Sequence, residues 1–575
     1  RAIDVAFLAT QPDALYEKVG VAADGVPAAV PIWTTTAWTL PANQAVALAA
    51  DLDYELWEFH RDGGLLRVVL AAELSADALQ RFGADSPQKL AGFTGDRLAG
   101  LALQHPFYPR EVPLINADFV TLDAGTGAVH IAPGHGHDDF AAGVANDLPL
   151  ENPVGGDGVY LSGTELLGGQ HIYKAGEQII ELLTERGRLL HVEDYEHSYP
   201  HCWRHRTPLI FRATPQWFIN LDQNGLRGAA LSAIGTVEWL PDWGEQRIEG
   251  MVSGRPDWCI SRQRTWGVPI PLFIHRETDE LHPDTPALLE RVAERMDEQG
   301  ADAWFELDPR ELLGDDARDY AQVTDTMDVW MDSGMVHHCV AALRDEVGYP
   351  AELYLEGSDQ HRGWFQSSLL TAVGMHGTAP YRQVLTHGFT VDEHGRKMSK
   401  SLGNTIEPQK IVKTLGADIL RLWIAGTDYR GEMSLSDEIL KRVTDSYRRM
   451  RNTARFLLGN LDGFEPSRDQ VAADELVDLD RWAIGRAQAL QDELRLAYER
   501  YEFHRVYQML HNFCVVDMGG FYLDVIKDRL YTTGRRSIPR RSAQTAMYQI
   551  AEAMVRWLAP VLSFTAEEIW EALPG

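Results

Sequence analysis

The spacing of apolar residues changes twice along this chain of 575 residues, and the changes divide it into three parts. Residues 1–193 contain short apolar runs separated by Gly, Pro and Asp, a pattern typical of β-strands. Between residues 194 and 435 strand-like runs alternate with helical ones, which indicates α/β units. After residue 435 apolar side chains recur every three or four positions, as in amphipathic helices. A chain of this length also exceeds what one hydrophobic core supports, so we expect several domains.

Individual segments locate the expected elements within these parts. In the first part we expect strands at residues 26–40, 45–50, 65–72 and 119–132. In the second, the run LYLEG (353–357) precedes a helical stretch at 363–375, and a further strand-like run covers 381–389. Residues 270–325 are acidic and polar, which indicates an insertion. The third part is expected to form a helical bundle from stretches at 440–457, at 479–501 and from 543 onward.

The composition indicates a globular protein but does not indicate a particular function. The chain is 45% hydrophobic and 24% charged, as in ordinary globular proteins, and contains no apolar run long enough to cross a bilayer. Four scattered cysteines and the lack of a signal-peptide pattern favour a reducing, cytoplasmic compartment. A net charge of −31 argues against a general nucleic-acid coat, but basic patches at 441–455 and 534–541 leave local RNA contacts open. Both ends look cut, which predicts an internal fragment of a longer protein.

The loop GRKMSKSLGN, residues 395–404, holds Lys397 and Lys400 between glycines. One interpretation is a solvated polar turn, and the other is a binding site for polyphosphate. Two neighbouring strand ends favour phosphate, because ligands bind at the carboxyl ends of strands in α/β sheets. The first strand end carries Glu356, Asp359 and Gln360, although a capped turn with solvated charges remains an alternative. The second strand end is THGF at 386–389.

Eight motifs stand in a fixed order along the chain: WTTTAWTLPAN, GTGAVHIAPGHGHDDF, HSYPHCWRHRTPLIFRATPQWF, WCISRQRTWG, DVWMDSG, EGSDQHRGWF, HGFTVDEHGRKMSKS and DSYRRMRNTARFLLGNL. With them the chain resembles the class I aminoacyl-tRNA synthetases over essentially its whole length, and most closely the bacterial-type members specific for isoleucine. Valine- and leucine-specific members remain alternatives. They carry an arginine-containing TTRP segment where this chain has TTTAWTLPAN, so that segment discriminates best.

The resemblance implies a multidomain α/β fold with three domains. Residues 1–193 form a β-rich editing domain inserted in a Rossmann-like catalytic fold, and 194–435 form the C-terminal half of that fold. Residues 436–575 form a truncated, all-α anticodon-binding bundle. The implied reaction joins L-isoleucine and ATP, with Mg²⁺, into an adenylate and then transfers the acyl group to tRNA. The resemblance also implies a monomer that does not bind membranes.

The resemblance assigns roles to residues of the catalytic half. Lys397 and Lys400 act catalytically on the departing pyrophosphate, Lys400 foremost. Gln360 and Trp364 border the isoleucine pocket. The ATP and adenylate are contacted by a larger set: Glu356, Gly357, Asp359, His387, Gly388, Phe389, Met398, Ser399 and Lys400.

An apolar pocket rejects valine poorly, because one missing methylene changes the binding free energy by only ~1–3 kcal/mol; isoleucine against valine is the standard example. A second, hydrolytic site is therefore expected in residues 1–193, in which Asp139 holds the α-ammonium of misattached valine. Its other members are Thr34, Thr35, Thr36, Asn43 and His130. The alternative is structural, since threonine-rich strands are common and His–Asp pairs often cap loops.

For tRNA, the resemblance points to the basic stretch with Arg448, Arg449 and Arg451, although such a stretch is also typical of a solvated helix face. Two functions from other classes compete. A stand-alone editing hydrolase predicts degraded KMSKS and EGSDQHRGW segments, and both are intact here. A non-catalytic RNA-binding module does not explain the editing residues.

The chain departs from the family pattern at several points. Ala37 stands where proline is usual, and Met331 and Met335 replace the usual residues of DVWFDSG. The motif HIGH is absent, so we expect the fragment alone to be inactive in amino-acid activation. Cys202 and His205 resemble half of a zinc site, but without a second half we favour packing and expect no metal here. The resemblance allows zinc only in the missing C-terminal part of the parent protein.

Overall fold

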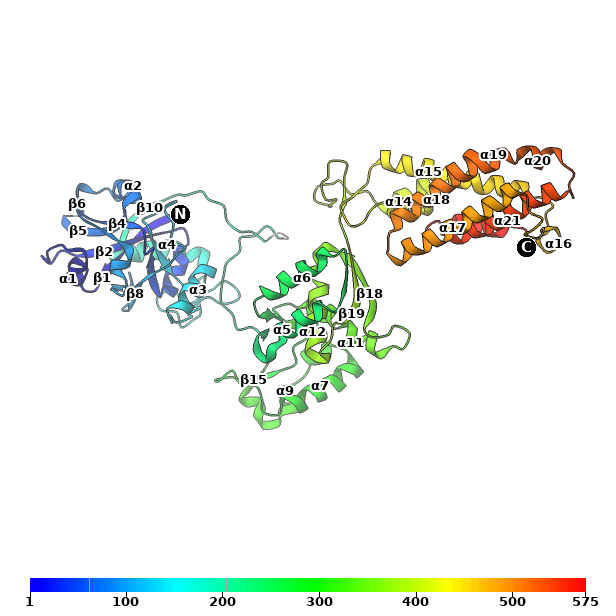
Figure 1. Ribbon diagram of the computed structural model, residues 1–575. Coiled ribbons are helices and arrows are strands. Elements are labelled where there is room, and N and C mark those ends of the chain that lie inside the picture. The colour runs from blue at the N-terminus through cyan, green and yellow to red at the C-terminus, as the bar shows by residue number, and fades with distance from the viewer. Residues whose placement is uncertain (62, 203–204) are drawn as a thin grey trace. The chain divides into compact units, whose positions relative to one another are not determined.

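The computed structural model describes residues 1–61, 63–202 and 205–575. The chain forms two compact units, Arg1–Pro215 and Gln216–Gly575, and the first therefore extends beyond the expected boundary near residue 193. Figure 1 shows a β-rich unit at the N-terminal end, drawn in blue and cyan, and α/β and helical parts in green to red. In the described residues, none of the helices combines the length and apolar character that a membrane crossing needs.

The first unit is built on a ten-stranded sheet in the order β6-β4-β5-β2-β1-β7-β8-β3-β9, with β10 paired to β1. Helices α1 (Pro12–Val19), α2 (Ser75–Arg81), α3 (His137–Ala145) and α4 (Ile172–Glu185) accompany it. The β-rich character expected from the sequence is confirmed. The strands are β1 (Ala2–Ala9), β2 (Ala28–Thr34), β3 (Ala45–Leu48), β4 (Asp53–Arg61), β5 (Gly64–Ala71), β6 (Asp85–Thr94), β7 (Ala102–Gln104), β8 (Glu111–Asn116), β9 (Ala128–Ile131) and β10 (Leu189–Glu193).

The threonine segment, residues 34–43, departs from the expected strand over 26–40. Strand β2 ends at Thr34, and the chain turns into a 3₁₀-helix, η1 (Ala37–Ala42). The Thr36 carbonyl accepts the N–H of Thr39 at 3.0 Å, and Pro41 has no N–H to give to a strand ladder. The second half of that strand prediction is therefore wrong, because local turn bonds replace ladder bonds.

The second unit contains a three-stranded parallel sheet in the order β12-β19-β18. Its strands are β12 (Glu238–Leu240), β18 (Ala351–Gly357) and β19 (Tyr381–His387), and helix α12 (Trp364–His376) connects the last two. Helices α5 (Leu226–Ile234) and α6 (Trp243–Ser253) share a core with α12 and the sheet. A strand–helix–strand unit with parallel strands confirms the α/β prediction for this part.

The expected insertion at 270–325 is a small substructure with its own apolar core. Strand β15 (Phe273–His275) pairs with β16 (Tyr320–Gln322), and helices α7 (Thr285–Gln299), α8 (Asp302–Phe305) and α9 (Pro309–Leu313) lie between them in sequence. Trp304 is fully buried in this core. Its indole N–H donates to the Val323 carbonyl at 2.8 Å, which ties the helices to the return strand.

The C-terminal part is the helical bundle that the sequence predicts. Its main helices are α15 (Asp437–Asn460), α17 (Asp478–Glu499), α18 (Phe503–Asn512), α21 (Ile538–Leu558) and α22 (Ser563–Ala572), coloured yellow to red in Figure 1. They share one apolar core that includes Leu457, Leu490, Phe513 and Ile550. One feature was not expected from sequence: residues Phe513–Tyr522 form a π-helix of ten residues, η8. Such runs are rare in α-helical proteins.

Candidate functional site

The first candidate site lies at the carboxyl ends of β18 and β19. Parallel pairing places Glu356 opposite Thr386 and Gly357 opposite His387. A side chain at Gly357 would have its Cβ 2.8 Å from Asp359 Oδ1, 3.5 Å from His387 Cε1 and 3.9 Å from Phe389 Cε1. The register thus gathers Asp359, His387 and Phe389 around a glycine that leaves space between them.

Both polar atoms of the Gln360 side chain form hydrogen bonds within this strand end. Its Oε1 accepts the backbone N–H of Trp364 at 3.0 Å, which satisfies a donor at the start of α12. Its Nε2 donates to Asp359 Oδ2 at 3.2 Å and so orients that carboxylate. Glu356 and Asp359 are both exposed, so their carboxylates face solvent at the end of the sheet.

Trp364 forms an aromatic wall one helical turn further on. Its ring stacks on Tyr354 with centroids 4.0 Å apart and planes 8° apart, and its indole N–H donates to the Ser333 carbonyl at 3.0 Å. Trp330 approaches from the DVWMDSG segment, because a Cβ at Gly363 would lie 2.7 Å from its ring. Sequence reasoning missed Tyr354 and Trp330, although Trp330 stands in a quoted motif.

Gly388 is required by a close approach of two backbones. A Cβ at this position would lie 2.0 Å from the Gly431 carbonyl oxygen. The Gly388 N–H donates to the Tyr429 carbonyl at 2.8 Å, so the segment after β19 is fixed against residues 429–431.

The KMSKS loop follows β20 (Thr390–Val391) and leads to α13 (Pro408–Leu415). Asn404 ties its two ends together: Oδ1 accepts the N–H of Ser399 and Nδ2 donates to Asp392 Oδ2, both at 2.9 Å. Asp392 also accepts the N–H groups of His394 and Arg396 at 3.0 Å. The hydrogen bond from Asn404 and those from Arg396 and His394 hold the pKa of the Asp392 carboxyl below its usual range.

The two lysines of this loop have different surroundings. The Lys397 ammonium lies 3.4 Å from the centroid of the Phe389 ring, a cation–π contact. Lys400 is exposed, and its ammonium forms no hydrogen bond or ion pair within the described part of the chain. Met398 and Ser399 are half-buried between them. Lys400 is therefore the lysine that is available to an external anion.

The second candidate site lies in the first unit, where a chain of hydroxyls leads from the threonine segment to His130. The hydroxyls of Thr34 and Thr36 are 3.2 Å apart, and those of Thr36 and Thr39 are 3.5 Å apart. Thr39 Oγ1 lies 3.0 Å from His130 Nε2 on β9. Thr35 is half-buried, and its hydroxyl forms no hydrogen bond with the described residues. Sequence reasoning missed Thr39, which belongs to the same motif as the other threonines.

His130 is a neutral group at the inner end of this chain. Burial lowers the pKa of its imidazole to about 4, so the ring is uncharged at neutral pH. Its Nδ1 has no hydrogen-bond partner among the described residues, and neither does the buried Oδ1 of Asn43. Asn43 donates from Nδ2 to the Ala45 carbonyl at 2.8 Å.

Asp139 lies in the first turn of α3, close to His135. Its Oδ1 accepts the backbone N–H of Ala132 at 2.8 Å, which fixes the turn between β9 and α3. Its Oδ2 folds back over Gly136, where a Cβ would lie 2.2 Å away. Burial raises the pKa of this carboxyl. Oδ1 therefore has a structural role in this turn.

His135 was not expected to belong to this site. Its ring packs edge-on against Trp38 with centroids 5.0 Å apart, and its Nδ1 lies 3.0 Å from the Phe211 carbonyl. Burial lowers the pKa of His135 below its usual value, although the hydrogen bond to the Phe211 carbonyl and the nearby Asp139 carboxylate oppose this shift. The ring thereby contacts Trp38 of η1 from the turn that precedes α3.

Among residues 1–61, 63–202 and 205–575, no group of three or more His, Cys, Asp or Glu side chains is arranged to hold a metal ion. Cys202 Sγ and His205 Nδ1 are 3.5 Å apart. The residues between them, 203 and 204, lie outside the described part of the chain.

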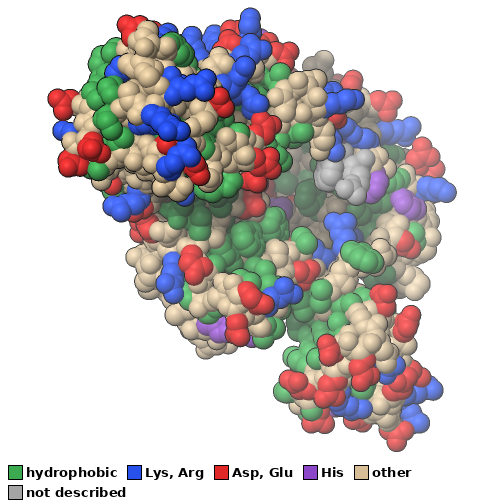
Figure 2. Space-filling view, turned by 90° about the vertical axis from the view of Figure 1, so that its right-hand side faces the viewer, with side chains coloured by type: hydrophobic (Ala, Val, Ile, Leu, Met, Phe, Trp, Pro, Cys, Tyr) green, Lys and Arg blue, Asp and Glu red, His purple; other side chains and the backbone are tan. Residues whose placement is uncertain are grey.

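The arginines expected to contact tRNA lie on α15. Arg448 pairs with Asp445 at 3.4 Å and is 70% exposed at its side chain, whereas Arg451 pairs with Glu568 at 2.7 Å. Arg449 is exposed. In the face shown in Figure 2, basic and acidic side chains are intermixed rather than separated. Arg449 is thus the arginine of this set with the fewest competing contacts.

Comparison with known proteins identifies the family. Residues 34–436 match the family described as tRNA synthetases class I (I, L, M and V), and residues 480–575 match the anticodon-binding domain of tRNA ligase. The chain therefore belongs to the class I tRNA synthetases, and the resemblance seen in its motifs is confirmed.

Particular relatives are isoleucine–tRNA ligases. The enzyme of Nitrosococcus oceani is 61% identical over 575 residues, and that of Alkalilimnicola ehrlichii is 61% identical over 577 residues. Both matches cover 100% of this chain. The chain spans 61% of the length of these curated relatives.

Two solved structures are similar at lower identity. The Agrobacterium radiobacter K84 agnB2 LeuRS–tRNA–LeuAMS complex is 19% identical with a TM-score of 0.43, covering 100% of this chain and 61% of its own. Mycobacterium tuberculosis methionyl-tRNA synthetase bound by methionyl-adenylate is 20% identical, with a TM-score of 0.47. The match covers 65% of this chain and 66% of the methionyl-tRNA synthetase chain.

Proposed function

We propose that the protein containing this chain attaches isoleucine to its tRNA in two steps, through an isoleucyl-adenylate. The observation that carries the proposal is the intact strand-end site, in which Asp359, His387 and Phe389 surround Gly357 and the KMSKS loop follows in sequence. The identity to isoleucine–tRNA ligases over the whole chain supports isoleucine as the amino acid. Mg²⁺ enters with ATP as part of the substrate.

In this mechanism the site positions its substrates and stabilises developing charge. Asp359, oriented by Gln360, accepts hydrogen bonds from the adenylate, and His387 with Phe389 borders the adenine. The wall of Trp364, stacked on Tyr354, supplies apolar surface for the isoleucine side chain. Lys400 stabilises the negative charge that grows on the departing pyrophosphate, which is where electrostatic catalysis acts.

The test of this proposal is the choice of amino acid by the full-length protein. ATP–pyrophosphate exchange is expected to be most efficient with isoleucine, with kcat/KM for valine lower by a factor of about 10 to 200. A preference for valine, leucine or methionine would overturn the assignment.

We further propose that the first unit hydrolyses valine that is wrongly attached to the isoleucine-accepting tRNA. The supporting arrangement is the hydroxyl chain from Thr34 to Thr39, which ends at neutral His130, with Asp139 nearby in sequence on α3. Hydroxyls of this kind hold a ribose and a water, and a carboxylate binds an α-ammonium through a charge-assisted hydrogen bond.

Asp139→Asn is expected to slow release of valine from pre-charged tRNA by at least about tenfold, because a charge-assisted hydrogen bond contributes ~1.5–3 kcal/mol. The asparagine Oδ1 can still accept the Ala132 N–H, so the turn before α3 is preserved. The measurement is release of labelled valine by the 575-residue chain. The matched control is Asp138→Asn, which removes an exposed charge from the neighbouring position.

Equal deacylation by wild type and Asp139→Asn would remove this carboxylate as the ammonium anchor. If the two asparagine variants slowed deacylation equally, a general loss of negative charge would be the cause instead.

We also propose that α15 contacts tRNA phosphates through Arg449. Arg449→Ala is expected to weaken tRNA binding and to reduce the slope of log K against log salt by about one unit, as loss of one phosphate contact does. Binding is measured over a series of salt concentrations. Arg495→Ala on α17 serves as the control, since Arg495 is similarly exposed and pairs with Glu499 at 3.7 Å. An unchanged slope for Arg449→Ala would favour a solvated helix face.

A further inference from the structure

Three side chains from two other segments of the first unit hold the backbone of the threonine segment. Tyr160 Oη donates to the Trp38 carbonyl at 2.5 Å, and His105 Nε2 lies 2.9 Å from the Leu40 carbonyl. Further along, a single nitrogen of Arg110, Nη2, donates to the carbonyls of both Pro41 and Asn43, at 2.8 and 2.7 Å. Four carbonyls between residues 38 and 43 are therefore bound by side chains 65 or more residues away in sequence.

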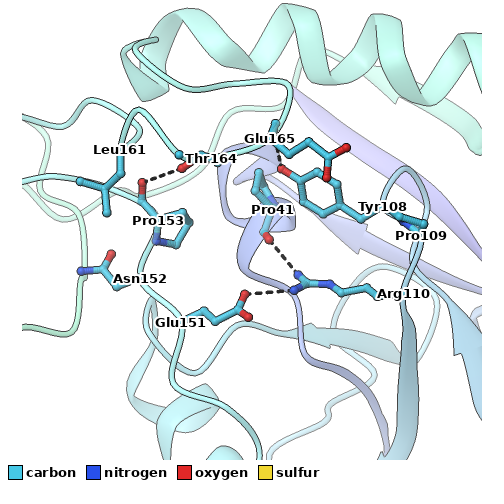
Figure 3. A pocket seen from close by; sticks show the side chains of 11 residues that line it. Pro41, Tyr108, Pro109, Arg110, Glu151, Asn152, Pro153, Leu161, Thr164 and Glu165 are labelled. Carbon is cyan, nitrogen blue, oxygen red and sulfur yellow. Dashed lines mark hydrogen bonds and ion pairs between the residues drawn. The ribbon is translucent and has the colours of Figure 1, made fainter. Parts of the chain in front are cut away.

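Arg110 is itself held in place. Its Nη1 donates to Glu151 Oε2 at 3.0 Å, and Figure 3 shows the guanidinium pointing between Glu151 and Pro41. This group forms one wall of a cavity of about 530 Å³. A planar guanidinium supplies several donors in a fixed geometry, which suits it to bridging two carbonyls at once.

His105 acts as a neutral connector. Its Nδ1 accepts the backbone N–H groups of Phe107 and Tyr108 at 3.3 and 3.0 Å, so Nε2 carries the proton and donates to Leu40. Burial lowers the pKa of this imidazole to about 3, and the ring keeps this tautomer at neutral pH.

The threonine segment needs such support because it lacks strand pairing. Beyond Thr34 it forms a 3₁₀-helix whose internal bonds are few. Thr39 lies in this helix and its hydroxyl is 3.0 Å from His130 Nε2, so any movement of the helix backbone changes this distance.

We propose that Tyr160, His105 and Arg110 are positioning residues of the editing site, which set the placement of the threonine hydroxyls without contacting the substrate. This inference rests on the proposed editing function. Its consequence is that selectivity between valyl- and isoleucyl-tRNA depends on three side chains outside the threonine motif.

The test compares three variants with one matched control in the 575-residue chain. Tyr160→Phe removes only the hydroxyl that binds Trp38, and Arg110→Met removes both carbonyl contacts. Tyr108→Phe is the control, because its hydroxyl donates to the Glu165 carbonyl at 2.8 Å in the same region but not to the threonine segment (Figure 3). Arg110→Lys keeps a charged donor without the planar geometry and should be intermediate.

Deacylation of valyl-tRNA is expected to fall about threefold for Tyr160→Phe and at least about tenfold for Arg110→Met, with Tyr108→Phe within about twofold of wild type, since small displacements of catalytic groups are costly. The ratio of valyl- to isoleucyl-tRNA deacylation is expected to fall as well. A mere loss of folded protein lowers both rates equally and leaves that ratio unchanged.

The possible results distinguish the positioning roles from the editing function on which they rest. A wild-type chain that does not deacylate valyl-tRNA overturns the editing proposal itself. A wild type that deacylates, with Tyr160→Phe and Arg110→Met at the wild-type rate, overturns only the positioning roles. Reduced rates with an unchanged ratio show that Tyr160 and Arg110 contribute stability alone, and this too overturns the inference.

Discussion

Replacing Lys400 by alanine in the full-length protein is expected to lower the rate of isoleucine-dependent ATP–pyrophosphate exchange by about a hundredfold or more, as the loss of one preorganised transition-state donor does. The KM for isoleucine should change by less than about threefold, because an interaction made only in the transition state affects turnover rather than ground-state binding. Exchange kinetics at saturating and limiting isoleucine separate the two quantities.

The geometry of the loop supports Lys400 rather than its neighbour for this role. Lys397 already lies over the Phe389 ring, whereas the Lys400 ammonium has no partner among the described residues. The control is Lys413→Ala, which removes an exposed lysine from α13, beyond the loop. An exchange rate for Lys400→Ala equal to that of the control would remove Lys400 from the mechanism. A rise in the KM for isoleucine as large as the fall in rate would instead assign Lys400 to substrate binding.

The catalytic half could be read from the sequence because its signals are local. A strand-like run at 353–357 is followed directly by a polar turn and an apolar helix, and the structure has β18 and α12 at these places. Parallel strands place their carboxyl ends at one edge of the sheet, so the proximity of Gly357 and His387 follows from the strand pattern alone. The pairing of Trp330 with Gly363 depends on tertiary packing, which no local pattern contains.

The candidate editing site could be predicted only in part. The sequence predicts roles for Thr34, Thr36 and His130, but it does not show that Thr39 contacts His130 across 91 residues. The turn into η1 was missed because the threonines have high strand propensity, and tertiary contacts outweigh propensity. The support from Tyr160 and Arg110 has no local sequence signal, because neither a buried tyrosine nor a half-buried arginine that binds a distant carbonyl has a characteristic pattern around it.

The largest loss of stability is expected for Asp480→Ala in the helical bundle. Asp480 is fully buried and accepts hydrogen bonds from Tyr522 at 2.8 Å, Ser542 at 2.5 Å and both terminal nitrogens of Arg529 at 2.7 Å. Removing one partner of a buried ion pair costs ~3–5 kcal/mol, because the remaining charge and polar groups lose their compensation. Hydrogen exchange of the α17 and α21 amides measures the resulting free energy of opening.

Asp480 on α17 joins this helix to three later segments of the bundle. Tyr522 ends the π-helix η8, Arg529 lies in α20 (Lys527–Thr532) and Ser542 in α21, so one carboxylate on α17 fixes their mutual packing. The matched control is Asp478→Ala, two residues away, whose side chain is 98% exposed and pairs with Arg481 at 3.3 Å. An exposed pair of this kind contributes at most about 1 kcal/mol, so exchange in the control should stay close to wild type. Equal protection in the two variants would mean that the bundle is held by its apolar core alone, and that Asp480 serves only to satisfy Arg529.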